Sequence, residues 1–266
     1  MTAIALTIAG SDPSGGAGVQ ADLKSFFAHG AYGMAALALL TVQNTLGVRR
    51  CELMAPDLLR EQIEALFDDM PPHAIKTGAL GGPAQVDAVV DVLRRRRGTP
   101  LVVDPVCVSK SGNSLLDTAG QTALLERLVP LATLVTPNLD EAALLLGRSI
   151  RTAEEIARAG REFVAMGAGA ALMKGGHREG DAIDVLCTAD GSIELHAPRI
   201  ATRNTHGVGC SLSAAITARL ARGEPLTDAC RAAKRWITDA ISRAPNLGAG
   251  HGPVDHFAPA PDLNRE

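Results

Sequence analysis

Short apolar segments alternate along the chain with segments whose apolar residues recur at helical spacing. The helical spacing is clear in residues 58–67 and 86–93. The short segments are apolar throughout, which is typical of parallel strands buried on both faces. They comprise residues 3–9, 35–42, 74–76, 101–103, 133–135 and 170–173. The pattern predicts an α/β fold, with a central, mostly parallel sheet covered by helices on both faces.

The last third of the chain adds a hairpin and two helices to this pattern. Residues 183–187 and 193–196 flank the turn signal Ala-Asp-Gly, which indicates a β-hairpin. Helical patterns follow in residues 212–220 and 229–241. No linker-like composition, internal repeat or low-complexity segment interrupts residues 1–266, so we expect a single domain.

The first six predicted strands all end in polar or glycine chemistry. A single ending of this kind is ordinary turn chemistry. In open α/β sheets, however, ligands bind beyond the carboxyl ends of the strands, so six such endings together predict a polar small-molecule site. The endings are Gly10-Ser11-Asp12, Gln43-Asn44, Thr77-Gly78, Asp104-Pro105, Thr136-Pro137-Asn138 and Lys174-Gly175-Gly176.

The composition argues against nucleic acid or a membrane surface as a partner. Of the 266 residues, 46% are hydrophobic and 21% are charged, which is typical of a globular protein. A net charge of -3 gives no field that attracts nucleic acid or anionic membranes, and 3% aromatic residues argue against base stacking. The basic cluster at residues 94–97 follows an apolar-periodic segment, so we interpret it as a solvated helix end.

Cysteine usage and the lengths of the apolar runs predict a cytoplasmic protein. The cysteines at positions 51, 107, 187, 210 and 230 form no CxxC pair, which argues against a disulfide framework or a zinc site. No charged segment precedes the apolar residues 3–9, so we interpret them as a strand and not as a signal peptide. The longest apolar run, residues 34–42, is too short to cross a bilayer.

The glycine-rich loop between Gly10 and Gly18 suggests two phosphate-binding motifs and fits neither. A P-loop needs a lysine directly after its last glycine, and the first lysine here is Lys24. The segment from Gly16 to Ala21 matches GxGxxA on paper. It begins several residues after the predicted strand, however, and no acidic residue follows about twenty positions later to hold a ribose.

Asp22 lies in a predicted helix whose buried stripe we expect to be Val19, Leu23, Phe26 and Phe27. It stands three positions after Val19, at the edge of that stripe. A carboxylate there needs partners, because burying an unpaired charge is costly. Two interpretations remain open: an acid that complements the helix dipole, or a contact to a ligand.

The segment NTHGVGCSLSAAI, residues 204–216, places two glycines and Cys210 at the start of a predicted helix. Backbone N–H groups exposed there favour a bound anion. His206 suggests a Cys–His hydrolase pair, but it lies outside the predicted helix and no third, orienting residue is evident. A packing role for small residues stays open. The alternative is a backbone anion hole followed by a group that takes a proton, which suits phosphoryl transfer.

Six blocks of the sequence together resemble a known family. They are ALTIAGSDPSGGAGVQADLKSF, AYGMAALALLTVQNTLGV, VVDPVCVSKSG, TPNLDEAALL, LMKGGH and NTHGVGCSLSAAI. Across residues 4–256 the chain resembles the hydroxymethylpyrimidine/phosphomethylpyrimidine kinases of thiamine biosynthesis, a branch of the ribokinase-like superfamily. The resemblance implies a ribokinase-like α/β fold. It also implies ATP-dependent phosphorylation of 4-amino-5-hydroxymethyl-2-methylpyrimidine, and then of its monophosphate to the diphosphate.

The resemblance assigns the pyrimidine pocket to Gly10, Asp22 and Gln43. The amide of Gln43 suits an aminopyrimidine edge, because it can both donate and accept hydrogen bonds. Ala79 and Cys107 stand where the family commonly has methionine. Ala79 lies beside the expected pocket, so the loss of a long apolar side chain predicts a looser fit and a broader acceptor range that includes pyridoxal or pyridoxine.

The resemblance assigns the nucleotide side to Asn138, Lys174 and Thr205, with Lys174 placed to balance phosphate charge. It also implies Mg²⁺. We take Asp104 and Glu141 as candidates for holding this ion through water, because Mg²⁺ keeps much of its hydration shell.

Gly207, Val208 and Gly209 resemble the anion hole of the superfamily, and Cys210 occupies the position where most of its members have a basic aspartate. The resemblance implies that Cys210 accepts the proton of the attacking hydroxymethyl group. A helix N-terminus lowers the pKa of a thiol, which predicts a thiolate near neutral pH, although bound phosphates would oppose this effect. Val208 replaces a common threonine and should matter little, because the hole works through backbone N–H groups.

Two alternatives to this kinase remain at the level of sequence. One is a pyridoxal or pyridoxine kinase of the same superfamily. The other is a non-catalytic pyrimidine sensor, against which Lys174 and Cys210 argue. The predicted strand at residues 48–53 is expected at a sheet edge, where it could pair across a homodimer.

Overall fold

The computed structural model describes residues 2–108, 112, 115–175 and 180–261; residues 109–111 and 176–177 of the quoted sequence blocks lie outside them. Among the described residues, nine strands form one sheet in the order β3-β2-β1-β4-β5-β6-β7-β8-β9. The strands are β1 (Ile4–Ser11), β2 (Tyr32–Asn44), β3 (Gly47–Leu53), β4 (Ala74–Thr77), β5 (Leu101–Val103), β6 (Leu134–Val135), β7 (Ala170–Met173), β8 (Asp184–Thr188) and β9 (Gly191–Leu195).

The sheet is parallel in its centre and antiparallel at both ends. Strands β2, β1, β4, β5, β6 and β7 pair in parallel. Strand β3 pairs antiparallel with β2, and β8 and β9 form the predicted hairpin beside β7. The central strands therefore end at one edge of the sheet, as the sequence pattern predicts.

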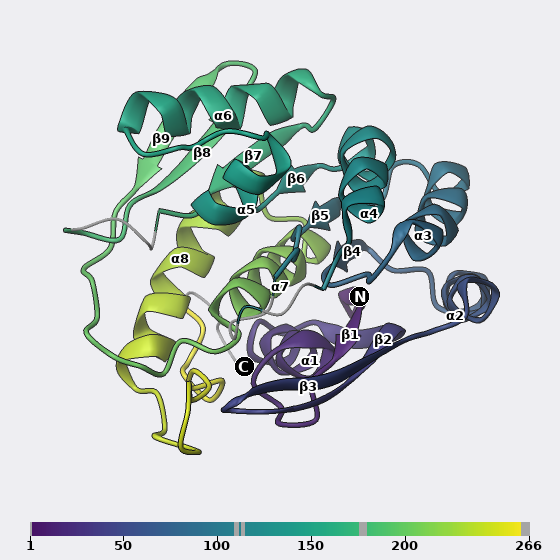
Figure 1. The fold of residues 1–266 in the computed structure, drawn as a ribbon, viewed down its shortest axis with the longest axis horizontal. Helices are drawn as coiled ribbons and strands as arrows, with labels where there is room; N and C mark the ends of the chain where they lie inside the picture. The colour runs from purple at the N-terminus through teal and green to yellow at the C-terminus, as the bar shows by residue number, and fades with distance from the viewer. Residues whose placement is uncertain (1, 109–111, 113–114, 176–179, 262–266) are drawn as a thin grey trace.

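Helices cover both faces of the sheet (Figure 1). Helices α1, α7 and α8 lie on one side, and α2, α3, α4 and α6 lie on the other. The helices are α1 (Gly18–Ala28), α2 (Pro56–Asp69), α3 (Pro83–Arg95), α4 (Thr118–Ala123), the π-helical η1 (Leu124–Leu128), the 3-10 helix η2 (Val129–Leu131), α5 (Leu139–Leu145), α6 (Ala153–Ala165), α7 (Val208–Ala221) and α8 (Leu226–Ser242). The predicted three-layer arrangement is confirmed.

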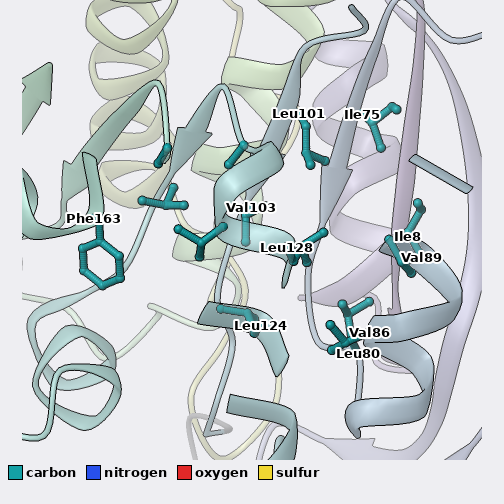
Figure 2. Packing of buried hydrophobic residues seen from close by; sticks show 14 of the residues in the cluster. Ile8, Ile75, Leu80, Val86, Val89, Leu101, Val103, Leu124, Leu128 and Phe163 are labelled. Atoms are coloured by element: carbon teal, nitrogen blue, oxygen red, sulfur yellow. The ribbon is translucent and has the colours of Figure 1, made fainter. Parts of the chain in front are cut away.

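The larger hydrophobic core lies between the sheet and the second group of helices. Figure 2 shows side chains of the strands, such as Ile8, Ile75 and Val103, packed with Val89 of α3 and Leu128 of η1. These side chains are almost fully buried, and each buried aliphatic side chain contributes about 1.5–3 kcal/mol to folding. This packing fixes the strand ends, which carry the polar side chains.

The buried stripe of α1 differs from the predicted one. Phe27 is 75% exposed, whereas Val19, Asp22 and Phe26 are almost completely buried. Phe27 was expected in the buried stripe because it is an apolar residue beside Phe26. The helix is instead turned so that Asp22 lies at the centre of the buried face, where it has charged and polar partners.

Candidate active site

A cavity of about 630 Å³ opens at the carboxyl ends of the central strands. Every residue that the sequence assigned to the site lines it except Asp22. In sequence order, these lining residues are Gly10, Gln43, Ala79, Asp104, Asn138, Glu141, Lys174, Thr205, Gly207, Val208, Gly209 and Cys210. The structure therefore brings together side chains from strands that lie far apart in the sequence.

Two helix N-termini meet inside this cavity. Helix α1 begins at Gly18 and α7 follows Gly207, and both glycines have positive φ angles, of 58° and 76°. A Cβ at Gly207 would lie 1.8 Å from the carbonyl oxygen of Gly16, and a Cβ at Gly18 would lie 2.3 Å from that of Gly10. Only glycine permits this approach. No side chain of the described residues caps α7. The N–H of Val208 donates to the Thr205 carbonyl at 3.4 Å, which leaves the N–H groups of Gly209 and Cys210 for an anion.

Cys210 lies where the two helix N-termini meet, and its thiol is protonated at neutral pH. Burial raises the pKa of Cys210 to about 12, although Lys76 and a hydrogen bond from the backbone N–H of Gly18 act in the opposite direction. The expected lowering of this pKa by the helix N-terminus is therefore wrong. Desolvation inside the cavity, together with the nearby Asp22 and Asp104, outweighs the effects that favour the thiolate.

Asp22 lies behind the cavity and not in its lining. Its side chain is 0% exposed, accepts a hydrogen bond from Thr7 Oγ1 at 2.6 Å and pairs with Lys76 Nζ at 2.9 Å. Burial raises the pKa of Asp22, and Lys76 and Thr7 oppose that effect. The expected contact between Asp22 and a substrate stays a prediction. Lys76, which pairs with Asp22, does line the cavity.

Asp12 and His206 join the glycine-rich loop to the segment before α7. Asp12 accepts hydrogen bonds from the backbone N–H groups of Ser14 and Ala17, and its Oδ2 lies 2.7 Å from His206 Nε2. The same ring nitrogen lies 3.2 Å from Gln43 Nε2. His206 thus pairs with Asp12, and the sequence-based alternative of a Cys–His pair finds no support in these contacts. Hydrogen bonds to His206 and Ser14 hold the pKa of Asp12 below its usual value, although burial opposes them.

Lys174, Asp104 and Glu141 form a charged cluster on the other side of Cys210. Lys174 Nζ lies 2.9 Å from Asp104 Oδ1 and 3.9 Å from Glu141 Oε2. Burial opposes the charged form of each group, but Lys174 lowers the pKa of Asp104, and Asp104 raises the pKa of Lys174. Burial raises the pKa of Glu141 to about 7, because Lys174 compensates only partly.

The two carboxylates of this cluster fit Mg²⁺ only in part. Asp104 Oδ1 already accepts from Lys174 and Thr136, and Glu141 Oε2 accepts from the backbone N–H of Asn138. Among the described residues, no group of three or more His, Cys, Asp or Glu side chains could hold a metal ion. One or two carboxylates with water and substrate phosphates are, however, the usual ligands of Mg²⁺. Asp104 and Glu141 could therefore supply at most part of such a coordination shell.

A further buried ion pair lies beside the segment that follows β7. Asp184, at the start of β8, pairs with Lys234 of α8 at 2.7 Å and accepts a hydrogen bond from the backbone N–H of Gly175 at 2.9 Å. Both members of the pair line the cavity. The sequence analysis did not identify Asp184, Lys234 or Lys76 as site residues. The sequence around each of them does not show which distant residue it pairs with.

No helix in the described part of the chain is both long and apolar enough to cross a membrane. The five cysteines are all free.

Comparison with known proteins identifies the family to which these residues belong. Residues 12–255 match the family model described as phosphomethylpyrimidine kinase. The chain is 49% identical over 261 residues to a hydroxymethylpyrimidine/phosphomethylpyrimidine kinase of Rhizobium meliloti, covering 97% of this chain and 98% of the relative.

Solved structures agree with this assignment. Phosphomethylpyrimidine kinase from Clostridium difficile superposes with a TM-score of 0.80 at 42% identity, covering 89% of this chain and 98% of that one. Pyridoxal kinase from Bacillus subtilis, solved as an ADP complex, gives a TM-score of 0.89 at 36% identity, covering 97% of this chain and 98% of that one. The ribokinase-like fold is confirmed. The chain is a kinase and belongs to the phosphomethylpyrimidine kinase family.

Proposed function

We propose that the protein transfers the γ-phosphoryl group of ATP to 4-amino-5-hydroxymethyl-2-methylpyrimidine, and then a second one to the resulting monophosphate. The observation that carries this proposal is the order of side chains along one cavity. Gln43 lies on β2 and Lys174 follows β7, and α7, whose first turn carries Cys210, contacts β1, β4 and β5, which lie between those two strands in the sheet. A nucleotide and an acceptor bound at the two ends would meet at Cys210.

The acceptor side is suited to an aminopyrimidine. The amide of Gln43 offers one donor and one acceptor edge. Gly10 lines the same cavity, and a Cβ there would lie 2.4 Å from Leu39 Cδ1, so a side chain at this position would displace Leu39. In the transfer, the hydroxymethyl oxygen attacks the γ-phosphorus in line and ADP leaves. Backbone N–H groups at Gly207–Cys210 and the Lys174 ammonium would stabilise the charge on the transferred group.

Cys210 is the residue proposed to accept the proton of the hydroxyl group. Because burial raises the pKa of its thiol to about 12, only a small fraction is thiolate at neutral pH. The proton transfer then depends on that fraction, and the rate of the first transfer should follow it as pH changes.

Mg²⁺ is proposed as a companion of the nucleotide, with Asp104 and Glu141 on its protein side. Such an ion supplies positive charge between the phosphates. Glu141 would bind Mg²⁺ best when its carboxyl group is ionised. Because its pKa is raised to about 7, this ionisation depends on pH near neutrality.

The direct test of a catalytic role is ATP turnover that depends on an added acceptor. With ATP and Mg²⁺, ADP should form only when the pyrimidine alcohol or its monophosphate is present. Binding of the pyrimidine without any ADP formation would instead favour the sensor alternative.

Pyridoxal is a second candidate acceptor. Ala79 lines the cavity where related kinases commonly have methionine, and pyridoxal kinases are among the similar structures. The shorter side chain leaves room for a larger or differently substituted ring. A side-by-side assay of both acceptors tests this proposal.

The remaining proposals concern the whole molecule. We propose that residues 1–266 act as one kinase domain in the cytoplasm, which the five free cysteines support.

We also propose a homodimer formed through the sheet edge at β3. Leu40, Val42 and Leu46 are exposed beside that edge, Leu46 to 66%. Sedimentation of the wild type and of Leu46→Lys tests this proposal, because only the dimer should be weakened by the charge.

A further inference from the structure

Two buried lysines lie on opposite sides of Asp104 along the edge of the sheet. Lys76 lies near the end of β4 and Lys174 follows β7, while Asp104 follows β5, which lies between these two strands in the sheet (Figure 1). Both ammonium groups reach the cavity. A Cβ added at Gly209 would lie 3.1 Å from Lys174 Nζ. A Cβ added at Gly78 would lie 3.1 Å from Lys76 Nζ.

The two lysines therefore serve different halves of the cavity. Lys174 stands on the side of Asn138 and Thr205, which the family resemblance assigns to the nucleotide. Lys76 stands on the side of Gly78 and Ala79, next to the expected pyrimidine pocket. Neither the proposed transfer mechanism nor the family resemblance gives Lys76 a role in catalysis or binding.

The Lys76 ammonium keeps hydrogen-bonding capacity for a ligand. It donates one hydrogen bond among the described residues, to Asp22 Oδ2, and an ammonium has three N–H groups. Burial acts to lower the pKa of Lys76, but Asp22 raises it beyond its usual value, so the side chain is charged. Asp22 Oδ1 has no hydrogen-bond partner within the described residues. Lys76 and Asp22 thus leave hydrogen-bonding groups unused. A buried ion pair of this kind does not by itself indicate a stabilising role.

The two phosphorylations put different charges on the acceptor side. The first acceptor is a neutral alcohol, whose oxygen must lose a proton. The second is a phosphate monoester with a charge of about -1.5 to -2 at neutral pH. One of its oxygens attacks the γ-phosphorus, a new P–O bond forms, and the bond to the β-phosphate bridging oxygen breaks, with the electron pair leaving on ADP. This oxygen has no proton to lose, but its phosphate repels the phosphates of ATP.

We propose that Lys76 binds the phosphate of the monophosphate acceptor and thereby selects for the second phosphorylation. This inference rests on the proposed two-step function. It predicts opposite effects for two neighbouring residues: Cys210 serves mainly the first transfer, which releases a proton, and Lys76 serves mainly the second, which brings in a dianion.

The test measures kcat/KM separately for the pyrimidine alcohol and for its monophosphate. In Lys76→Met the value for the monophosphate should fall about 10- to 100-fold further than the value for the alcohol, because a hydrogen bond to a charged group is lost. Cys210→Ala should shift the ratio in the opposite direction. Calorimetric titration with the monophosphate alone should show weaker binding to Lys76→Met, while binding of the alcohol should change much less.

Variants that keep the buried charges balanced separate this role from a structural one. Lys76→Met combined with Asp22→Asn avoids an unpaired buried carboxylate and should show the same ratio as Lys76→Met. Lys76→Arg keeps the charge and should recover part of the second transfer. Asp22→Asn alone keeps the lysine but removes the carboxylate that favours its charged form, so it should lower the ratio less than Lys76→Met does.

Equal losses for both acceptors in Lys76→Met and in the double variant would overturn the inference, as would an unchanged affinity for the monophosphate. These outcomes are distinct from a failure of the proposed function. If wild-type protein phosphorylates neither acceptor, the proposed function is wrong; if it phosphorylates both and the ratio stays fixed, only the role of Lys76 is wrong.

Discussion

The backbone N–H of Gly18 acts on the thiol of Cys210 and lowers its pKa, against the larger effect of burial. This contact joins the first residue of α1 to the first turn of α7, although the two lie almost 200 positions apart in the sequence. Both helices therefore direct their positive ends to the same point of the cavity. That arrangement depends on glycines whose backbone conformation other residues rarely adopt.

Gly207→Ala should destabilise the fold and abolish most of the activity. Its φ of 76° costs an L-residue about 1–2 kcal/mol, and its Cβ would clash with the Gly16 carbonyl at 1.8 Å. Chemical unfolding should show a total loss of at least about 3 kcal/mol. Gly223→Ala, at the other end of α7, is a matched control: its φ is 83° and nothing lies within 4 Å. A loss no larger than that of Gly223→Ala would contradict this account.

The first phosphorylation should accelerate with pH well beyond neutrality. Burial raises the pKa of Cys210 to about 12, so the thiolate fraction, and with it kcat, should rise about tenfold per unit between pH 6 and 9. Cys210→Ala should lower kcat at least about 100-fold while nucleotide binding persists. In Cys210→Asp, part of the activity should return and the profile should level off at lower pH. A wild-type rate independent of pH would exclude Cys210 as the base.

Mg²⁺ should bind the nucleotide complex more tightly above pH 7 than below it. The pKa of Glu141 is raised to about 7 by burial, so the carboxyl is protonated below that pH and ionised above it. Titration of Mg²⁺ into the complex with a non-hydrolysable ATP analogue should show an affinity that rises from pH 6 to pH 8. Glu141→Gln should bind the ion less tightly and lose this step. If Mg²⁺ affinity rises equally between pH 6 and pH 8 in Glu141→Gln, a group other than Glu141 causes the rise.

Ala79→Met should narrow the range of acceptors. Refilling the cavity beside the ring should lower kcat/KM for pyridoxal relative to the pyrimidine alcohol by about 10-fold. Cys107→Met is the matched control, because Cys107 is buried and does not line the cavity. If the two variants change the acceptor ratio equally, Ala79 does not control acceptor choice.

Local patterns were sufficient to predict the sheet and most of the cavity lining. The apolar strands and their polar endings follow from period and composition, so residues such as Gln43, Asp104 and Lys174 could be placed at one edge. Contacts between distant segments could not be predicted in this way. The pair of Asp22 with Lys76 joins residues 54 positions apart, and that of Asp12 with His206 joins residues 194 apart.

The pKa of Cys210 shows a second limit of sequence-based prediction. A thiol at a helix N-terminus is expected to ionise easily, but its pKa depends on how much water reaches it. That depends on Gly18, Lys76 and the walls of the cavity, and only the folded chain brings these together. The orientation of α1, which buries Asp22 and exposes Phe27, has the same origin.

A time course that counts phosphates on the product tests the central claim most directly. Purified protein is mixed with the pyrimidine alcohol, excess ATP and Mg²⁺, and the products are separated by ion-exchange chromatography and identified by ³¹P NMR. The account predicts that the monophosphate accumulates first and is then converted to the diphosphate, with one ADP released per phosphate added. A reaction that stops at the monophosphate, or that consumes only pyridoxal, would contradict it.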